Sequence, residues 1–377
     1  MIPSQRHLFD LPRDVAYLNC AYMSPLARPV LEAGMTGLAR KARPWNILPE
    51  DFFATTDAAR GHFARLLGAG AEDISVVPSA SYGIALAAAN LGVAAGQRIV
   101  LLADQFPSNV YHWRVLAEEA GAEVTTVARP AAGGWTAPLI EAIGADAAIV
   151  AAAHCHWTDG GLIDLGAVGR RCREVGAALV LDLTQSLGAL PIDVAEVRPD
   201  FAVAACYKWL LGPYSLGFAY VAPAHQDGRP LEHNWMARRG AENFSGLIDY
   251  RDDFQAGARR HDVGESANFA LMPMAERAMR MLVEWDPAAI QASLRGLTDG
   301  IADRARALGL EAADPSLRAG HFLGLRCPGG FPDGLLESLR RDGVFVSLRG
   351  NSLRVTPHLY NDAEDVERLF RALARAL

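Results

Sequence analysis

The fold is decided by two neighbouring segments, VLDLTQSLGALPID at residues 180–193 and DFAVAACYKWLLGP at residues 200–213. Each contains a short apolar run that is typical of a buried strand, followed by a side chain that can do chemistry. Asp182 ends the first run, and Lys208 follows the second, 26 residues further along the chain. Because ligands bind beyond the carboxyl ends of strands in open α/β sheets, these two residues mark the expected site.

Similar apolar runs alternate along the chain with stretches of helical period, which predicts an α/β fold with a mostly parallel sheet covered by helices on both faces. Helices are predicted between strands at 81–91, 110–120 and 165–175. We expect a large domain with seven strands, at 74–77, 98–102, 123–127, 147–152, 178–182, 201–204 and 217–221.

The pattern changes after the last of these strands. Residues 222–260 are rich in charge, glycine and aromatic side chains, and we expect them to be irregular. Helices are predicted at 273–284, 287–308, 334–342 and 363–377, and short strands at 321–327, 344–348 and 352–356. The expected organisation is an N-terminal arm of residues 1–14, a large domain of residues 15–258 and a small α+β domain of residues 259–377.

Composition excludes several classes of protein. Of the 377 residues, 51% are hydrophobic and 21% are charged, which rules out a disordered chain or a collagen-like repeat. A net charge of −7 without any basic block argues against nucleic acid or an anionic membrane as a partner. No apolar run approaches the roughly 20 residues of a membrane helix. The five cysteines form no CxxC pair, and the start of the chain does not resemble a secretory signal, so we expect reduced thiols and a cytoplasmic location.

Asp182 and Lys208 have the arrangement that a pyridoxal phosphate enzyme needs. The lysine amine forms a Schiff base with the cofactor aldehyde, and the carboxylate keeps the pyridine nitrogen protonated, so the ring accepts electrons from the substrate Cα. Apolar surroundings lower the pKa of such a lysine and favour its neutral form. The spacing alone equally allows Asp182 to cap a loop and Lys208 to be a solvated surface residue.

The two segments resemble the cofactor signature of the class V aminotransferase family, D-x-x-(H/Q)-S-x-G followed by D, six residues and (Y/H)-K. That family includes cysteine desulfurases, kynureninases and isopenicillin N epimerases, and the resemblance extends over most of the chain. It implies fold type I, the cofactor pyridoxal 5′-phosphate and a homodimer with shared active sites. It also implies that Lys208 is the Schiff-base lysine, Asp182 the pyridinium partner, Gln185 a partner of the ring hydroxyl and Tyr207 a partner of the phosphate.

Two turns resemble further parts of the family's cofactor site. The turn PSASYG at residues 78–83 matches the one that grips the phosphate, which implies this role for Ala80 and Ser81. An ordinary helix cap by Ser79 or Ser81 explains the same residues. The turn FPSN at residues 106–109 resembles kynureninase-like and epimerase-like members, in which the phenylalanine stacks on the pyridoxal ring. That role maps to Phe106, for which packing in the core is the alternative.

The stretch SLRGNSLRVTPHLYN at residues 347–361 resembles the family segment whose second arginine binds the substrate α-carboxylate. This implies that Arg354 is the carboxylate fork, a bidentate geometry that lysine cannot copy. A salt bridge to a nearby acid is the structural alternative, and the candidates are Asp362, Glu364 and Asp365.

Several residues receive no assigned role. His154 and His156 have no third ligand nearby, so no metal is expected. Trp157 stands where desulfurases carry an asparagine, and Glu265 stands where the family's dimer-contact turn carries threonine or asparagine. No cysteine lies between Arg349 and Arg354, which argues against one desulfurase group.

Three function classes are compatible with an α/β sheet of this kind. The first is a pyridoxal-phosphate enzyme acting on an α-amino acid, an aminotransferase in the first place, with a kynureninase-, desulfurase- or epimerase-like activity as the alternative. A nicotinamide-dependent oxidoreductase would need G-x-G-x-x-G after the first strand, where residues 79–83 offer none. A catalytically silent binding protein would have no use for Lys208, Asp182 and Arg354 together. The choice of reaction depends on pocket shape.

Overall fold

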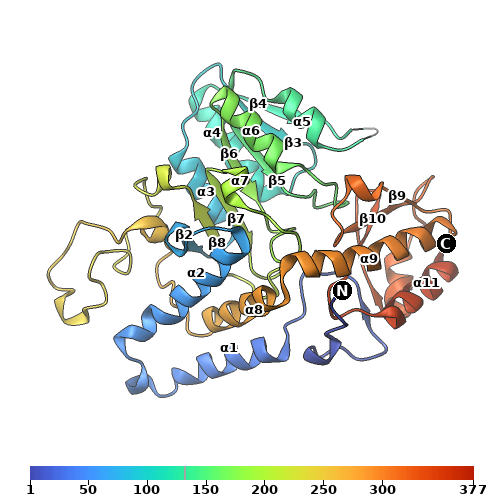
Figure 1. Cartoon of the computed structure of the whole chain (residues 1–377), viewed down its shortest axis with the longest axis horizontal. Helices are drawn as coiled ribbons and strands as arrows, with labels where there is room; N and C mark the ends of the chain where they lie inside the picture. Colours follow the sequence, from blue (N-terminus) through green and yellow to red (C-terminus); the bar gives the residue numbers. More distant parts are fainter. Residues whose placement is uncertain (131–132) are drawn as a thin grey trace.

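The computed structural model describes residues 1–130 and 133–377. Its centre is a sheet with the strand order β2-β8-β7-β6-β5-β3-β4 (Figure 1). Strand β8 runs antiparallel to both of its neighbours, and the other strands share one direction. The mostly parallel sheet is therefore confirmed, and each of the seven strands predicted for it is present to within one residue. The strands are β2 (Ile74–Val77), β3 (Arg98–Leu102), β4 (Glu123–Val127), β5 (Ala147–Ala153), β6 (Ala178–Asp182), β7 (Phe201–Ala205) and β8 (Gly217–Val221).

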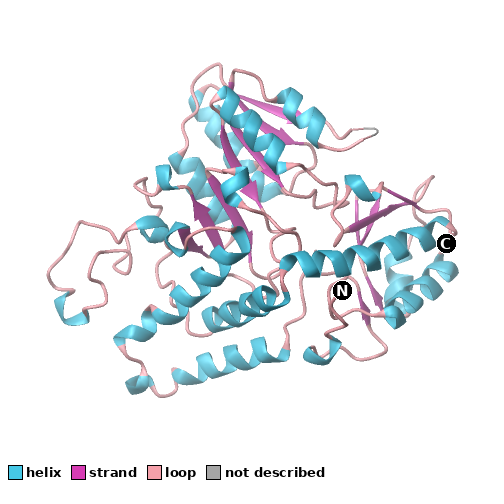
Figure 2. Ribbon diagram, viewed as in Figure 1, coloured by secondary structure: helices cyan, strands magenta, loops and turns pink. Residues whose placement is uncertain are grey.

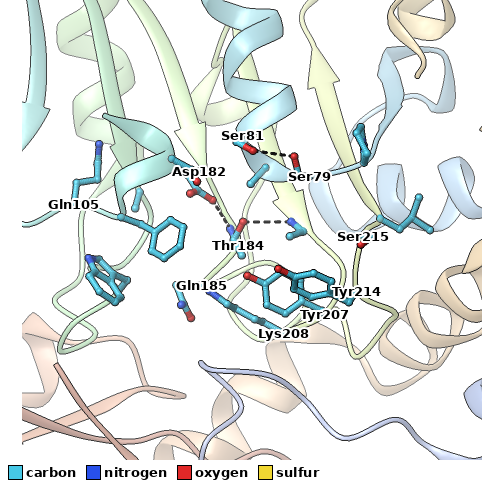
Figure 3. Close-up of a pocket in the computed structure, with 18 of the residues that line it drawn as sticks. Ser79, Ser81, Gln105, Asp182, Thr184, Gln185, Tyr207, Lys208, Tyr214 and Ser215 are labelled. Atoms are coloured by element: carbon cyan, nitrogen blue, oxygen red, sulfur yellow. Dashed lines mark hydrogen bonds between the residues drawn. The ribbon is translucent and has the colours of Figure 1, made fainter. Parts of the chain in front are cut away.

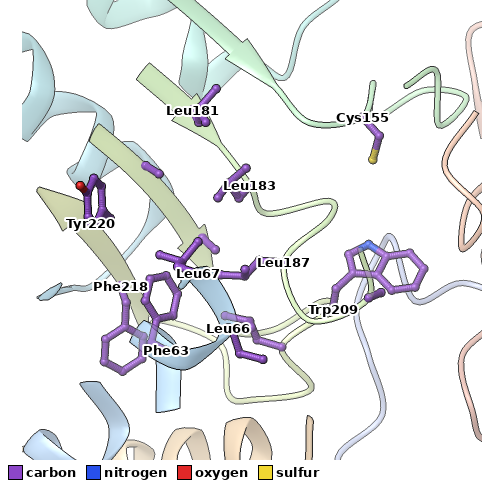
Figure 4. Close-up of a cluster of buried hydrophobic side chains, with 14 of the residues drawn as sticks. Phe63, Leu66, Leu67, Cys155, Leu181, Leu183, Leu187, Trp209, Phe218 and Tyr220 are labelled. Carbon is purple, nitrogen blue, oxygen red and sulfur yellow. The ribbon is translucent and has the colours of Figure 1, made fainter. Parts of the chain in front are cut away.

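Both faces of the sheet are covered by helices (Figure 2). On one face, Phe63 and Leu67 of α2 lie in the same apolar cluster as Phe218 of β8 (Figure 4), and the rings of Phe63 and Phe218 are 5.1 Å apart. On the other face, Ile84 of α3 and Trp113 of α4 belong to a second buried cluster. The helices of this part are α1 (Arg28–Arg40), α2 (Ala54–Leu67), α3 (Ala80–Asn90), α4 (Tyr111–Ala120), α5 (Thr136–Ala142), α6 (Leu165–Val175) and α7 (Val194–Val197).

Residues 222–270 contain only short 3-10 turns, at Pro223–His225, Phe244–Gly246 and Gly257–His261. The irregular segment predicted here is confirmed, and Figure 1 shows part of it as a yellow loop that projects from the body of the protein. Two long helices follow, α8 (Leu271–Trp285) and α9 (Pro287–Arg306). Within the described residues, no helix is both long and apolar enough to cross a membrane.

The C-terminal part contains a four-stranded antiparallel sheet in the order β12-β13-β10-β9. Its strands are β9 (Glu311–Ala312), β10 (Leu323–Arg326), β12 (Ser347–Arg349) and β13 (Ser352–Val355), and its helices are α10 (Leu335–Arg341) and α11 (Ala363–Ala376). Buried side chains of α9 and α11 form an apolar cluster of their own with this sheet. The small α+β domain predicted at this end of the chain is thus present.

One predicted strand was wrong in its extent. Residues 344–348 form two elements, because β11 (Val344–Phe345) pairs in parallel with β1 (Ala16–Tyr17), whereas β12 pairs with β13. The N-terminal segment therefore joins the C-terminal part, and Ala16 and Leu18 are buried in its cluster. Helix α8 instead buries Met279 and Leu282 in the cluster beneath the large sheet. A domain boundary at residues 258/259 stays a prediction.

Candidate active site

Five loops meet at one edge of the large sheet, because β2, β3, β5, β6 and β7 run in the same direction and end there. These loops line a cavity of about 230 Å³ (Figure 3). All cofactor-site residues predicted from the sequence lie in its lining, namely Ala80, Ser81, Phe106, Asp182, Gln185, Tyr207 and Lys208. Arg354 is not among the described lining residues. It does donate a hydrogen bond to Trp157, which belongs to the lining.

Lys208 lies in the turn after β7 and is 6% exposed. Its Nζ atom is 5.1 Å from the ring centroid of Phe106 and 5.3 Å from that of Tyr207. Within the described residues this Nζ atom has no hydrogen-bonding partner. Burial lowers the pKa of Lys208 to about 8, Asp182 opposes this effect, and the charges of Arg354 and Arg349 add to it. The amine is therefore partly neutral near pH 8, the form that attacks an aldehyde.

Asp182 is buried at the carboxyl end of β6. Its Oδ1 accepts a hydrogen bond from the backbone N–H of Thr184 at 3.0 Å, and the Thr184 hydroxyl accepts one from Ala205 N at 3.2 Å (Figure 3). These bonds tie the ends of β6 and β7 together. In the described part of the chain the second carboxylate oxygen has no donor, so it is available to a ligand in the cavity.

Ser79 caps helix α3. Its hydroxyl accepts a hydrogen bond from Tyr82 N at 3.1 Å and lies 2.9 Å from the hydroxyl of Ser81. The first N–H groups of the helix, those of Ala80 and Ser81, have no intrahelical acceptor and lie where an anion is favoured. Gly83 brings α3 close to the sheet, because a Cβ at this position would come within 2.6 Å of Val203. The cap by Ser79 therefore leaves these N–H groups without an acceptor, and their binding of a phosphate stays a prediction.

Three further residues of the lining were predicted from the sequence. Phe106 is half-buried and lines the cavity, and its ring meets that of Trp157 edge-on at 5.4 Å. The side-chain amide of Gln185 accepts a hydrogen bond from Trp209 Nε1 at 3.0 Å and donates one to Ala21 O at 3.1 Å. Its contact with a cofactor hydroxyl stays a prediction. Burial raises the pKa of Tyr207 to about 12.

Arg354 is 1% exposed on β13 and has no acidic partner among the described residues. It donates to the hydroxyl of Ser347 from Nε at 2.9 Å and from Nη2 at 2.7 Å, and to Trp157 O from Nη1 at 3.0 Å. Burial lowers the pKa of Arg354 to about 9, with the charge of Arg349 as a second cause. Since a guanidinium carries five N–H donors, two remain for an external acceptor.

The salt bridge considered as an alternative for Arg354 is not formed. Asp365 pairs with Arg6 at 2.8 Å, and Asp362 pairs with Arg13 at 2.6 Å. Glu364 lies 3.6 Å from the same Arg13 side chain. Both arginines belong to the N-terminal arm, which lies against the C-terminal part. These acids therefore form ion pairs with the arm and not with Arg354.

Sequence reasoning missed several lining residues, among them Thr184, Tyr214 and Ser215, and it named His156 without assigning it a role. Thr184 lies inside the signature segment, and a polar residue just after a strand end was the available signal. The ring of Tyr214 is tilted by 58° against that of Tyr207, with the ring centroids 4.6 Å apart, and nothing local indicated this contact.

The residues left without a role have clear structural surroundings. His156 packs flat against Trp135, with ring centroids 4.9 Å apart, and burial lowers its pKa to about 4. His154 is half-buried, and loss of solvation lowers its pKa to about 3. Glu265 is exposed, with a positive φ of 58°. Within residues 1–130 and 133–377, no group of three or more histidine, cysteine or acidic side chains could hold a metal ion.

Comparison with known proteins decides the family. A profile described as aminotransferase class-V matches residues 38–369. The chain belongs to the class V aminotransferase family. An uncharacterised aminotransferase of Bacillus subtilis is 26% identical to it over 99% of this chain and 98% of that protein. Isopenicillin N epimerase of Streptomyces clavuligerus is 27% identical over 95% of this chain and 94% of that protein. Kynureninase of Deinococcus radiodurans is 29% identical over 78% of this chain and 72% of that protein.

Solved structures show the same fold. The apo cysteine desulfurase of Thermococcus onnurineus has a TM-score of 0.84 at 18% identity, covering 100% of this chain and 98% of that one. A mutant of C-DES with glycine covalently linked to its pyridoxal-phosphate cofactor has a TM-score of 0.85 at 17% identity. The match covers 99% of this chain and 100% of that one. The predicted fold type I is confirmed.

Pyridoxal 5′-phosphate is the cofactor of class V aminotransferase family members, and the cavity has the donor set that this cofactor requires. The N–H groups at the start of α3 can donate hydrogen bonds to a phosphate, and the Lys208 amine is free to react with the aldehyde. The available oxygen of Asp182 can face a protonated ring nitrogen. Each group is left without a partner by the described residues, which is the condition expected of a cofactor site.

Proposed function

We propose that this class V family member acts on an α-amino acid and transfers its amino group. The observation that carries the proposal is the buried side chain of Lys208, whose Nζ has no hydrogen-bonding partner in the described part of the chain and which lies in one cavity with Asp182. The chain contains only two lysines, and the other, Lys41, is exposed on the surface. The B. subtilis aminotransferase, similar over almost its whole length, supports transfer as the reaction.

The proposed roles follow from these surroundings. Lys208 binds the cofactor aldehyde, and its amine moves a proton to and from the substrate Cα. Asp182 holds the proton on the ring nitrogen. Pyridoxal 5′-phosphate, when bound, supplies an electron sink for the bond broken at Cα. Ala80, Ser81 and Tyr207 bind the phosphate, Phe106 stacks on the ring and Gln185 contacts the ring hydroxyl.

Arg354 binds the substrate carboxylate in this proposal. Its guanidinium is held by Ser347 and Trp157 through neutral acceptors, so its charge stays uncompensated in the described structure. A buried charge without a counter-ion is costly, and a carboxylate with two oxygens matches the remaining N–H donors. An α-amino acid supplies that carboxylate next to the reacting amine.

A lyase or epimerase is the second candidate, and the epimerase of S. clavuligerus supports it through its full-length similarity. A desulfurase is disfavoured by the cysteines of the chain. Cys155 lines the cavity, but burial raises its pKa and its thiol donates to Gln185 O at 3.2 Å, so it is not a ready nucleophile. Cys327 is absent from the cavity lining among the residues described.

Lys208→Ala, with Lys41→Ala as the matched control, tests the proposal. The wild type and the Lys41 variant should show visible absorbance of a lysine-bound cofactor and retain it covalently after borohydride treatment. The Lys208 variant should lose both with an unchanged circular dichroism spectrum. Equal labelling in the Lys208 variant would show that the assignment is wrong.

An amino-acid panel then identifies the reaction. With a keto-acid acceptor, transamination forms a new amino acid and a new keto acid in equal amounts. Epimerisation gives only the other enantiomer, with uptake of solvent deuterium at Cα, and elimination releases ammonia. The proposal of amino-group transfer is contradicted if only the second or third outcome is observed.

We also propose a homodimer. Helix α1 exposes an apolar stripe of Leu31, Met35 and Leu38, which are 47%, 64% and 65% exposed. Such a stripe on one helix face is typical of a surface that a partner covers. Sedimentation that finds an active monomer would contradict the proposal. A cytoplasmic location stays a prediction.

A further inference from the structure

A second arginine lies beside Arg354. Arg349 ends β12, and Ser347, two residues before it, pairs with Arg354 across the two strands, so Arg349 and Arg354 share one face of the small sheet. The guanidinium carbons of both arginines lie 5.8 Å from the ring centroid of Trp157. Trp157 itself lines the active-site cavity and meets Phe106 edge-on. Both guanidinium groups therefore lie close to a side chain that forms part of the cavity lining.

Neither arginine has an anionic partner within the described residues. Arg354 is held by a hydroxyl and a carbonyl group, and Arg349 donates from Nη1 to Leu348 O at 2.8 Å. The charges of both arginines lower the pKa of Lys208, so all three cations act on the same space. Asp182 is the only acidic side chain in the described lining of the cavity.

The single α-carboxylate of an ordinary amino acid would leave Arg349 without a direct anionic partner. One α-carboxylate neutralises Arg354, and the cofactor phosphate is served by the N-terminus of α3, to which neither arginine belongs. Arg349 is half-buried, and it would still lack a counter-ion in the loaded site. Partly desolvated cations are stabilised by anions held at close range.

We propose that Arg349 binds a second anionic group of the substrate, so that this enzyme acts on amino acids whose side chain carries a negative charge. The inference rests on the proposed function, in which Arg354 takes the α-carboxylate. Trp157, in contact with both guanidinium groups, separates the two anion positions and sets the path of the substrate side chain. Dicarboxylic amino acids are the simplest members of this class.

The test uses the holoenzyme and compares acidic with neutral amino acids. Dissociation constants for aspartate and glutamate, and for alanine, asparagine and glutamine, are measured from the change in cofactor absorbance. Maleate and propionate, which lack an amino group, are measured by calorimetry. Wild type should bind the acidic ligands and maleate about tenfold or more tightly than the neutral amino acids and propionate, the effect of one charge-assisted contact.

Arg349→Gln should remove this preference by weakening the acidic ligands about tenfold while changing the neutral ones less than about twofold. Arg349→Lys keeps the charge without the planar fork and should show a smaller loss for the same ligands, which preserves the test if the first variant fails to fold. The matched control is Arg375→Gln, an exposed arginine paired with Asp342 at 2.9 Å, which should behave as wild type.

Two results would overturn the inference. If the wild type does not discriminate, or if Arg349→Gln weakens acidic and neutral amino acids equally, Arg349 only supports Trp157, and the proposed function stands without it. If no amino acid changes the cofactor spectrum although the Lys208-dependent absorbance is present, the proposed amino-acid chemistry fails, and this inference falls with it.

Discussion

Arg354 donates two hydrogen bonds to the single hydroxyl oxygen of Ser347, from Nε at 2.9 Å and from Nη2 at 2.7 Å. The Ser347 hydroxyl in turn donates to Asn19 Oδ1 at 2.9 Å. Because a hydroxyl has only one hydrogen, the bond to Asn19 turns the oxygen lone pairs toward the guanidinium. Arg354 is thus oriented by neutral groups, and its positive charge stays available for a ligand.

Ser347→Ala removes this orientation and keeps the charge. Because bonds to a charged group contribute about 1.5–3 kcal/mol each, we expect KM for an amino acid to rise about tenfold or more, with a smaller change in kcat. Arg354→Lys should raise KM further. Both effects should be much smaller for an amine that lacks a carboxylate. Equal effects on amino acid and amine would mean that the pair only stabilises the fold.

Asp182 accepts a structural hydrogen bond from Thr184 N and has a proposed electrostatic role toward the cofactor ring, and two variants separate these roles. Asp182→Asn keeps an oxygen that can accept from Thr184 N, whereas Asp182→Ala loses both the oxygen and the charge. We expect turnover to fall by several orders of magnitude in both, because the charge on the ring nitrogen is lost in both. Steady-state kinetics check this. If Asp182→Asn stays within about tenfold of wild type, about 1.4 kcal/mol, the negative charge is not needed.

The buried amine of Lys208 makes the stability of the cofactor-free protein depend on pH. Its pKa is about 8 in the folded protein against an ordinary value of 10.5, so the unfolded chain binds more protons between these values. Stability therefore rises with pH across this range, and the full penalty is present below pH 8. The penalty amounts to roughly 3 kcal/mol, because one pKa unit corresponds to about 1.4 kcal/mol.

Lys208→Met should remove that penalty. In urea unfolding without cofactor, the variant should be more stable than wild type at pH 7, and the difference should shrink as the pH approaches 10.5. Lys41→Met, at an exposed lysine, should instead follow the wild-type pH profile. A difference for Lys208→Met that does not vary with pH would point to packing rather than to charge.

The N-terminal arm is held by a buried ion pair. Arg6 and Asp365 lie 2.8 Å apart with side chains 6% and 4% exposed, whereas the pair of Arg13 and Asp362 involves an arginine that is 61% exposed. Arg6→Met leaves a buried carboxylate unpaired and should lower the free energy of unfolding by about 3–5 kcal/mol. Arg13→Met should lower the free energy of unfolding by less than about 1 kcal/mol. Urea unfolding of both variants measures this, and similar losses would contradict the role of burial.

Much of the large sheet could be predicted from the sequence, because apolar runs and helical period are local signals. The strands that end at Asp182 and precede Lys208 are each continuous apolar runs, as strands buried on both faces must be. Once those strands are parallel, their carboxyl ends meet at one edge, and the two side chains necessarily share a site. The signature residues therefore lie together without any further knowledge of the chain.

The partners of charged residues were decided only by the tertiary structure. Three acids within about a dozen residues of Arg354 made a local salt bridge plausible, yet Arg6 and Arg13 take these acids from more than 340 positions away in the chain. The division of residues 344–348 between two sheets has the same origin, since β1 pairs with β11 from the other end of the chain. Hydrophobic period encodes which face of an element is buried. It carries no information about which distant side chain comes to lie beside a given charge, because that depends on how the chain ends are brought together in three dimensions.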